Sequence, residues 1–210
     1  MPLNITVIEP TSPDFPPALQ NGALMAPPPC LWAIGNLRIL ETRLLGFFCS
    51  TRCPGNVILR AYDLALALRE AGVPVIGGFH SPMEQECLDV LLRGQQPVVI
   101  CPARSIARLR LPMAWRRPLA ESRLLILSPF EAKHRRPTTD LAEHRNRLVA
   151  TLAAASFVAY AAPGSRTERL CTDLVAQGRR VYTLALTENA QLMQGGAVGH
   201  TVHDLVASVQ

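Results

Sequence analysis

Positions 75–84 read Val-Ile-Gly-Gly-Phe-His-Ser-Pro-Met-Glu, a run that joins a predicted strand to the start of a predicted helix. Gly77 and Gly78 form the turn, and Ser81 with Glu84 matches the Ser-x-x-Glu capping box. Free backbone N–H groups and the positive end of the helix dipole make such a helix start a binding site for phosphate or another anion. An ordinary strand-to-helix turn of an α/β protein has the same pattern.

Four further loops of small, polar or arginine-bearing residues follow predicted strands, at 49–55, 101–104, 128–130 and 162–168. Ligands of α/β sheets bind at the carboxyl ends of the strands, and a hydroxyl beside a guanidinium suits phosphate or sugar. Turn chemistry alone also favours Gly, Pro and Ser. We predict one anion-binding surface, with the candidate residues Ser50, Arg52, Gly77, Gly78, His80, Ser81, Arg104, Gly164, Ser165, Arg166 and Thr167.

Arg145, Asn146 and Arg147 lie inside a helix predicted from 138 or 139 to about 154. Residues i and i+2 of a helix are about 200° apart, so the two arginines cannot share a face. One arginine is expected at the sheet edge, and the other toward solvent or a partner. A charged, solvated helix face is the simpler alternative.

Strands and helices alternate along the chain, which predicts a single α/β domain with a doubly wound, mostly parallel sheet. The expected strands are 30–34, 44–49, 73–76, 97–101, 124–127, 157–161 and 180–184. The expected helices are 57–71, 81–93, 113–121, 139–154 and 167–177, with short helical pieces at 190–194 and 202–208. Residues 1–40 are rich in proline and are expected to pack on the core as an irregular segment, with the main domain at 41–210.

The composition limits the classes of protein to which this chain can belong. A length of 210 residues with 49% hydrophobic residues supports one large core and excludes a disordered chain. No apolar run approaches the roughly 18–20 residues of a membrane span, and no secretory signal is visible, so a cytoplasmic protein is expected. Six scattered cysteines without a Cys-x-x-Cys pair are expected to be reduced thiols.

The net charge of +5 is concentrated in one part of the chain. Between 101 and 147 there are ten arginines and Lys133 against four acidic residues, and the remainder is close to neutral. Guanidinium groups bind phosphates bidentately, so this segment indicates a nucleic-acid partner. Genome composition or a solvated basic face would give the same count.

The chain resembles the DprA/Smf family of DNA-processing proteins over about 15–197. The Arg-Asn-Arg helix signature at Arg145, Asn146 and Arg147 is the most specific match. The other matching positions are Phe15, Pro16 and Leu19; Pro28, Pro29, Leu31, Gly35 and Asn36; Ser50, Thr51 and Arg52; positions 77–84; Gly164, Ser165 and Thr167; and Gly196 and Ala197. The glycine-rich second turn of the family is here Phe79, His80 and Ser81, and the winged-helix tail and N-terminal helical domain are not expected, which indicates a minimal or divergent member.

The resemblance implies an extended Rossmann-like fold that binds single-stranded DNA, acts in DNA processing and recombination, and hands the strand to a RecA-type recombinase. Phe79, His80 or Phe130 would stack on bases. A two-fold homodimer is expected through late elements, either the strand 180–184 or the tail around Val202, Leu205 and Val206. Neither a cofactor nor catalysis is required.

Three alternatives remain open. In the first, the segment 163–168 loosely resembles the Pro-Gly-Gly-x-Gly-Thr-x-x-Glu loop of LOG-type phosphoribohydrolases. Glu84, Glu168 and Arg147 would then act on a nucleotide N-glycosidic bond, or the protein would be a nucleotide sensor. A scaffold for a protein partner is the second. In the third, Cys49 and Cys53 would hold a metal with His80 or Cys87, although no metal is expected.

Overall fold

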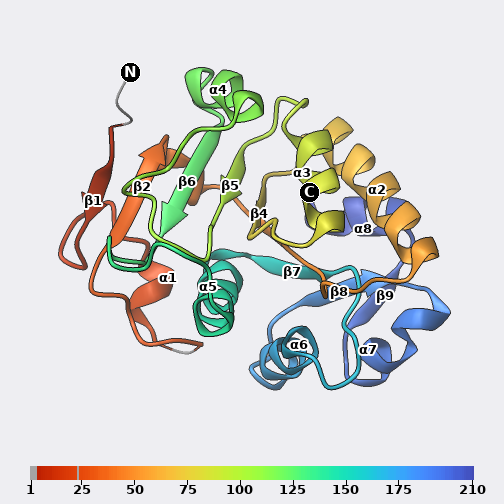
Figure 1. The fold of residues 1–210 in the computed structure, drawn as a ribbon. Helices are drawn as coiled ribbons and strands as arrows, with labels where there is room; N and C mark the ends of the chain where they lie inside the picture. Colours follow the sequence, from red (N-terminus) through yellow and green to blue (C-terminus); the bar gives the residue numbers. More distant parts are fainter. Residues whose placement is uncertain (1–3, 23) are drawn as a thin grey trace.

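The computed structural model describes residues 4–22 and 24–210, whose strands pair into one nine-stranded sheet (Figure 1). The strand order is β1-β2-β6-β5-β4-β3-β7-β8-β9. Seven neighbouring strands from β6 to β9 are parallel, whereas β1 and β2 are antiparallel additions at one edge. The strands are β1 (Thr6–Ile8), β2 (Leu31–Gly35), β3 (Leu45–Phe48), β4 (Val75–Gly77), β5 (Val98–Ile100), β6 (Leu124–Ser128), β7 (Ala155–Val158), β8 (Val181–Leu184) and β9 (Val198–His200).

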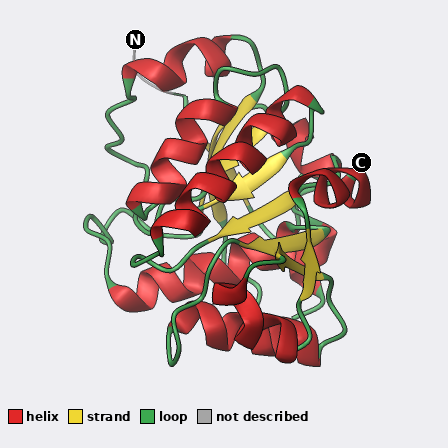
Figure 2. Ribbon diagram, turned by 90° about the vertical axis from the view of Figure 1, so that its right-hand side faces the viewer, coloured by secondary structure: helices red, strands yellow, loops and turns green. Residues whose placement is uncertain are grey.

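Helices cover both faces of the sheet (Figure 2). α2 packs on α3 and α8 on one face, and α5 packs on α1 and α6 on the other. The helices are α1 (Pro17–Gln20), α2 (Gly55–Glu70), α3 (Pro82–Leu91), α4 (Met113–Ala120), α5 (Thr139–Leu152), α6 (Arg166–Ala176), α7 (Ala190–Gln194) and α8 (Val202–Val209), with 3-10 turns at Leu37–Glu41 and Thr187–Asn189. None of the helices described here is long and apolar enough to cross a membrane.

Each central strand sends alternate side chains into two separate cores. Leu45 and Phe47 of β3 join the core under α2, α3 and α8, whereas Leu44 and Phe48 join the core under α1, α5 and α6. Because both faces are buried, the central strands are continuous apolar runs rather than alternating ones. This explains why short, wholly apolar segments could be recognised as strands.

The predicted fold class is confirmed. The expected strands and helices are present within a few residues of their predicted bounds, and β7 begins two residues earlier than expected. The strands β1 and β9 and the helix α1 were not predicted. The proline-rich start is more regular than expected, because β1 and β2 extend the sheet and Phe15 and Leu19 are buried in the core.

The strand order reverses between β3 and β7. From β3 the chain crosses through α2 to β4 on one side, whereas from β7 it crosses through α6 to β8 on the other. The loops that leave the carboxyl ends of β3 and β7 therefore diverge and open a crevice, which is the usual ligand position in such sheets.

Candidate nucleic-acid interface

A hollow of about 500 Å³ lies at this reversal, and we call it the switch-point hollow. It is lined by residues of the loops after β3, β4 and β7, of the first two turns of α5 and of the first turn of α6. Of the predicted residues, it brings together Ser50, Arg52, His80, Ser81, Arg145, Asn146, Gly164, Ser165, Arg166 and Thr167. Of the five strand-end loops that the sequence suggested, the hollow groups three, at 49–55, 77–81 and 162–168, and not those at 101–104 and 128–130.

Ser50 ties the two diverging loops together. Its hydroxyl accepts a hydrogen bond from the backbone N–H of Ala162 (3.0 Å) and lies 3.3 Å from the Ser165 hydroxyl. Its own backbone N–H donates to the carbonyl of Tyr160 at 2.9 Å. Ser50 is buried, so its side chain fixes the floor of the hollow and leaves ligand contact to its neighbours.

Glu84 occupies the helix start that the sequence presented as an open anion site. The capping box is present, because the Ser81 hydroxyl accepts from the backbone N–H of Glu84. The Glu84 carboxylate also accepts from the backbone N–H groups of Cys49 (3.1 Å), His80 (3.0 Å) and Ser81 (2.8 Å). The backbone N–H groups of His80, Ser81 and Glu84 at this helix start are therefore already bonded, and a buried carboxylate lies where the sequence predicted an anion.

Backbone N–H groups at the start of α6 are bonded to side chains in the same way. The Ser165 hydroxyl accepts from the backbone N–H of Glu168 (3.2 Å), and the Glu168 carboxylate accepts from that of Gly164 (2.6 Å). Arg166 lies beside Glu143 of α5, with 3.5 Å between Nε and Oε2, and remains exposed. Anion affinity in the hollow therefore depends on arginine side chains rather than on helix starts.

Arg145 is the arginine of the Arg-Asn-Arg signature that faces the sheet edge. Its guanidinium donates to the carbonyl of Cys101 (3.0 Å) and spans the ends of β4 and β5. Burial lowers the pKa of Arg145, and the nearby Glu84 carboxylate opposes that shift. A Cβ atom on Gly78 would lie 1.5 Å from Nη1 of Arg145, so any larger residue here would displace the guanidinium from its position.

Arg147 points away from the hollow. Its guanidinium contacts the Asp173 carboxylate (3.1 Å), the Leu24 carbonyl (3.2 Å) and the Glu143 carboxylate (3.6 Å). The two arginines of the signature thus lie on different faces, as their spacing predicts. The contacts of Arg147 are internal ion pairs that join α5 to α6.

The residues of the alternative hydrolase hypothesis are not assembled. Glu84 and Glu168 each bind backbone N–H groups of their own loops. Arg147 and Glu168 do not line the hollow that contains Glu84. Among the described residues there is also no group of three or more His, Cys, Asp or Glu side chains placed to hold a metal ion.

The cysteines near the hollow are free thiols. A hydrogen bond between the Cys49 and Cys53 side chains raises the pKa of the Cys49 thiol and lowers that of Cys53. Burial raises the pKa of Cys87 to about 12. At neutral pH, Cys49 and Cys87 are therefore protonated.

Of the three side chains expected to stack on bases, only His80 is exposed. The Phe79 ring is buried against Phe47, with 6.3 Å between ring centroids, and its backbone adopts a left-handed φ of 47°. Phe130 is buried between His134 and His144. The stacking role predicted for Phe79 and Phe130 is wrong, because both rings belong to the protein interior.

A second basic region lies beside the hollow, at the carboxyl ends of β5 and β6. We call residues 102–112 and 129–138 the basic loops. They are joined by hydrogen bonds from the Ser128 hydroxyl to the Arg104 carbonyl (2.9 Å) and from the Ser105 backbone N–H to the His134 carbonyl (2.8 Å). Their exposed cations are Arg104, Arg108, Arg110, Lys133, Arg135 and Arg136.

Only Lys133 of these six cations forms an ion pair within the described chain, with Glu131 at 3.0 Å. Arg104 does not line the switch-point hollow, although it was predicted in the same site. The basic loops instead continue the arginine-bearing surface along the same edge of the sheet.

Five residues of the hollow were missed by the sequence reasoning. They are Phe48, Thr139, Ala142, Glu143 and Arg169. Thr139, Ala142 and Asn146 are spaced three and four residues apart, so they share one face of α5. That spacing was visible in the sequence and could have identified them.

A family model described as DNA recombination-mediator protein A matches residues 6–205. The chain belongs to the DNA recombination-mediator protein A family. No curated protein sequence matches it in the corresponding comparison. The switch-point hollow is therefore a candidate site within the domain that defines this family.

Solved structures share the fold of this chain. DNA processing protein A from Streptococcus pneumoniae has a TM-score of 0.81 at 18% identity, over 99% of this chain and 75% of that one. DNA processing protein A from Helicobacter pylori, described for its single-stranded DNA binding mode, has a TM-score of 0.78 at 19% identity, over 98% and 95%. The molybdenum cofactor carrier protein from Chlamydomonas reinhardtii shares the fold less closely, with a TM-score of 0.55 at 13% identity, over 80% and 96%.

Proposed function

We propose that this protein binds single-stranded DNA along the carboxyl edge of its sheet, from the switch-point hollow across the basic loops. The observation that carries the proposal is the number of exposed arginines on loops that leave this one edge of the sheet. Arg52, Arg166 and Arg169 line the hollow, and the basic loops add five more arginines. Such a surface follows a phosphate backbone without reading its bases.

The hollow supplies a defined starting point for the strand. Its loops are held by Ser50 and Glu84, so arginines are presented from a fixed frame. His80 is exposed at the hollow and is available to stack on a base. No group in this arrangement has to perform a covalent step, and binding is sufficient for a recombination mediator.

Salt dependence of binding tests the proposal. For single strands, the log of the affinity falls with the log of salt by about 0.7 for each phosphate contacted. Arg52→Ala and Arg166→Ala should each make this slope shallower by about that amount, measured by fluorescence anisotropy with a labelled oligothymidylate. Arg52 should have the larger effect, because Arg166 is partly neutralised by Glu143.

The matched control is Arg93→Ala, an exposed arginine between α3 and β5 and therefore at the opposite edge of the sheet. Its salt slope should equal that of the unmodified protein. Equal salt slopes for all three variants and the parent, with folding intact, would show that the hollow is not part of the binding surface.

We also propose that the protein forms a two-fold dimer, but the predicted surface must be revised. β8 is an interior strand between β7 and β9, and Leu205 is fully buried where α8 packs on α2. Val202 and Val206 of the predicted tail are half-buried, and the edge strand β9 carries Val198, which is 50% exposed, so we propose an interface formed by β9 together with α8. Val198→Lys should convert a dimer to a monomer in sedimentation at tens of micromolar.

A dimer would bring two arginine-rich edges to one DNA strand and raise the affinity for oligonucleotides long enough to reach both. Affinity that does not depend on oligonucleotide length, together with a monomer in sedimentation, would contradict this part of the proposal. Transfer of the strand to a RecA-type recombinase is a further step. It predicts faster recombinase nucleation on DNA coated with this protein, and slower nucleation with Arg52→Ala.

A further inference from the structure

Two cysteines flank the arginine of the loop that joins β3 to α2. Cys49 follows the last residue of β3, and Cys53 lies two residues before the start of α2. Arg52 lies between them and lines the switch-point hollow. We call residues 49–53 the thiol loop. A chemical change at its two sulfurs would act directly on a residue of the proposed DNA site.

The two thiols contact each other and differ in character. The Cys49 thiol donates a hydrogen bond to the Cys53 sulfur. This bond, together with burial, raises the pKa of Cys49, whereas it lowers the pKa of Cys53. Cys53 is half-buried at the margin of the core, and Cys49 is only 9% exposed. Cys53 is therefore the thiol that meets an oxidant first as a thiolate, and Cys49 is the thiol beside it that can complete a disulfide.

Cys87 lies near this pair but is directed elsewhere. Its sulfur is 3.6 Å from the Ala61 carbonyl and 3.4 Å from the Met83 sulfur. Burial raises the pKa of Cys87 to about 12, so it is a protonated thiol of the core. It is therefore less reactive than Cys53 toward an oxidant.

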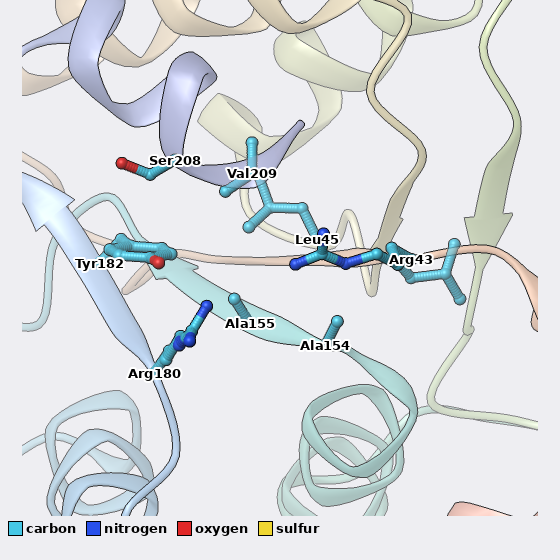
Figure 3. A pocket seen from close by; sticks show the side chains of 9 residues that line it. Arg43, Leu45, Ala154, Ala155, Arg180, Tyr182, Ser208 and Val209 are labelled. Carbon is cyan, nitrogen blue, oxygen red and sulfur yellow. The ribbon is translucent and has the colours of Figure 1, made fainter.

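The strand that leads into the thiol loop is fixed at its start. The Ala154 backbone N–H donates to the Leu44 carbonyl at 2.9 Å, and Leu45 pairs with Ala155 of β7 (Figure 3). The space left between these strand starts and α8 is about 20 Å³, which holds about one water molecule. The start of β3 is therefore closely packed, and a change in the thiol loop has to be absorbed in the loop itself.

The residues on either side of the exposed part of the loop are also fixed. Ser50 is bonded to the loop after β7 through its hydroxyl and its backbone N–H. The Pro54 carbonyl accepts from the backbone N–H of Ile58 (3.1 Å) in the first turn of α2. A disulfide holds two sulfurs closer together than a hydrogen bond does, so its formation must tighten the loop. Thr51 and Arg52 are exposed, and they are the residues left to move.

We propose that Cys49 and Cys53 form a reversible disulfide that weakens DNA binding by displacing Arg52 from the switch-point hollow. This inference rests on the proposed function, because Arg52 belongs to the proposed DNA site. The oxidant is hydrogen peroxide. The Cys53 thiolate attacks its O–O bond, gives up two electrons to it, becomes a sulfenic acid and releases hydroxide.

The second step closes the disulfide. The Cys49 sulfur attacks the Cys53 sulfur, so that an S–S bond forms and the S–O bond breaks. The hydroxyl group leaves with the Cys49 proton as water. Dithiothreitol reverses the reaction by thiol–disulfide exchange and restores both thiols.

Peptide mapping tests the pairing without any variant. Trypsin cleaves inside the thiol loop, after Arg52, so its two cysteines fall in separate peptides, 44–52 and 53–60. After mild treatment with hydrogen peroxide and alkylation of the remaining thiols, these peptides should be recovered joined, and dithiothreitol should separate them. The denatured protein should lose two of its six thiols. Peptide 53–60 joined to the peptide of Cys87, or no joined peptide at all, would overturn the proposal.

DNA binding tests the consequence. The oxidised protein should bind labelled oligothymidylate with a salt slope shallower by about 0.7, the change expected for the loss of one phosphate contact. Peroxide should change neither Arg52→Ala, which has already lost this contact, nor Cys53→Ser, which cannot form the disulfide. Cys30→Ser, at another partly exposed cysteine, is the matched control and should respond like the parent.

Two outcomes separate the inference from the proposed function. Unchanged or tighter DNA binding by the fully oxidised parent would overturn the regulation, even where the joined peptides are found. Absence of DNA binding by the reduced protein would overturn the proposed function and the regulation with it, and the peptide map does not depend on that result.

Discussion

The switch-point hollow and the basic loops lie at one edge of the same sheet but hold their polar groups in opposite ways. In the hollow, Ser50, Glu84 and Arg145 are buried and bonded to backbone atoms of neighbouring loops. In the basic loops, Arg104 and Arg135 are exposed and have no carboxylate partner in the described chain. The first region has a fixed shape, and the second provides mainly charge.

This difference separates two contributions to binding. A pre-organised hollow loses little conformational entropy when a ligand enters, so its contribution depends on geometry. Free arginines on loops act by displacing counterions from phosphates, so their contribution depends on salt. Mutations of the buried residues of the hollow should therefore cause structural damage, whereas mutations of exposed arginines, in the basic loops or at the hollow, should change the salt response.

Gly78→Ala should have the largest effect, because the new Cβ would overlap the Arg145 guanidinium. Displacing a buried guanidinium from the Cys101 carbonyl should cost about 2–4 kcal/mol of the free energy of unfolding. Urea denaturation measures this cost, and DNA affinity should fall together with stability. Gly55→Ala is the control, since no atom lies within 4 Å of its Cβ position and its stability should be unchanged.

Ser50→Ala should have the next largest effect. It removes the acceptor for the Ala162 backbone N–H and the contact with Ser165, at a cost of about 1–2 kcal/mol. The loops after β3 and β7 would separate, so DNA affinity should fall with little change in salt slope. Ser105→Ala, which alters a hydroxyl in the basic loops, is the control. A changed slope for Ser50→Ala would contradict the separation of shape from charge.

The sequence was sufficient for the parts of the site that depend on local rules. The capping box at Ser81 and the opposite directions of Arg145 and Arg147 follow from helix geometry alone, and both are present. The sequence could not show that the Glu84 carboxylate also accepts from Cys49, because 35 residues separate the two and no local pattern marks the contact. Because of this tertiary contact, the helix start that the sequence predicted as an anion site instead holds the loop after β3 in place.

The errors in the fold have a similar origin. β1 and β9 have three residues each, too few to show an alternating pattern, and they are specified by the strands that they pair with. Phe79 was expected to be available to stack on bases. Its ring instead fills the core beside Phe47, and the backbone takes a left-handed conformation to allow this.

In the basic loops, Arg104→Gln combined with Arg135→Gln should leave the free energy of unfolding nearly unchanged. The slope of log affinity against log salt should become shallower by about 0.7 for each arginine that contacts a phosphate. Anisotropy titrations at several salt concentrations provide the measurement. The variant for comparison is Ser50→Ala, whose salt slope should stay close to that of the parent. Identical slopes for the double variant and the parent would show that DNA does not reach these loops.

The smallest effect is expected at His144, which contacts Phe130 where α5 meets the basic loops. Desolvation, followed by the charge of Arg147, lowers the pKa of His144 below its ordinary value of 6.5. The unfolded chain therefore binds the proton more readily, so stability should decrease as the pH falls below about 6.5. His144→Gln should reduce this decrease in denaturation measured at pH 7.5 and 5.5, whereas His203→Gln on α8 should not.

The bond between Ser50 and Ser165 also has a consequence for the order of events during synthesis. The two residues are 115 positions apart, and β3 cannot pair with β7 until the later segment has left the ribosome. At about 5–20 residues per second, the first loop waits roughly 6–23 s for its partner. The basic segment between 101 and 147 is synthesised during this interval. The nascent chain therefore carries the positive charge of this segment before the switch-point hollow can form.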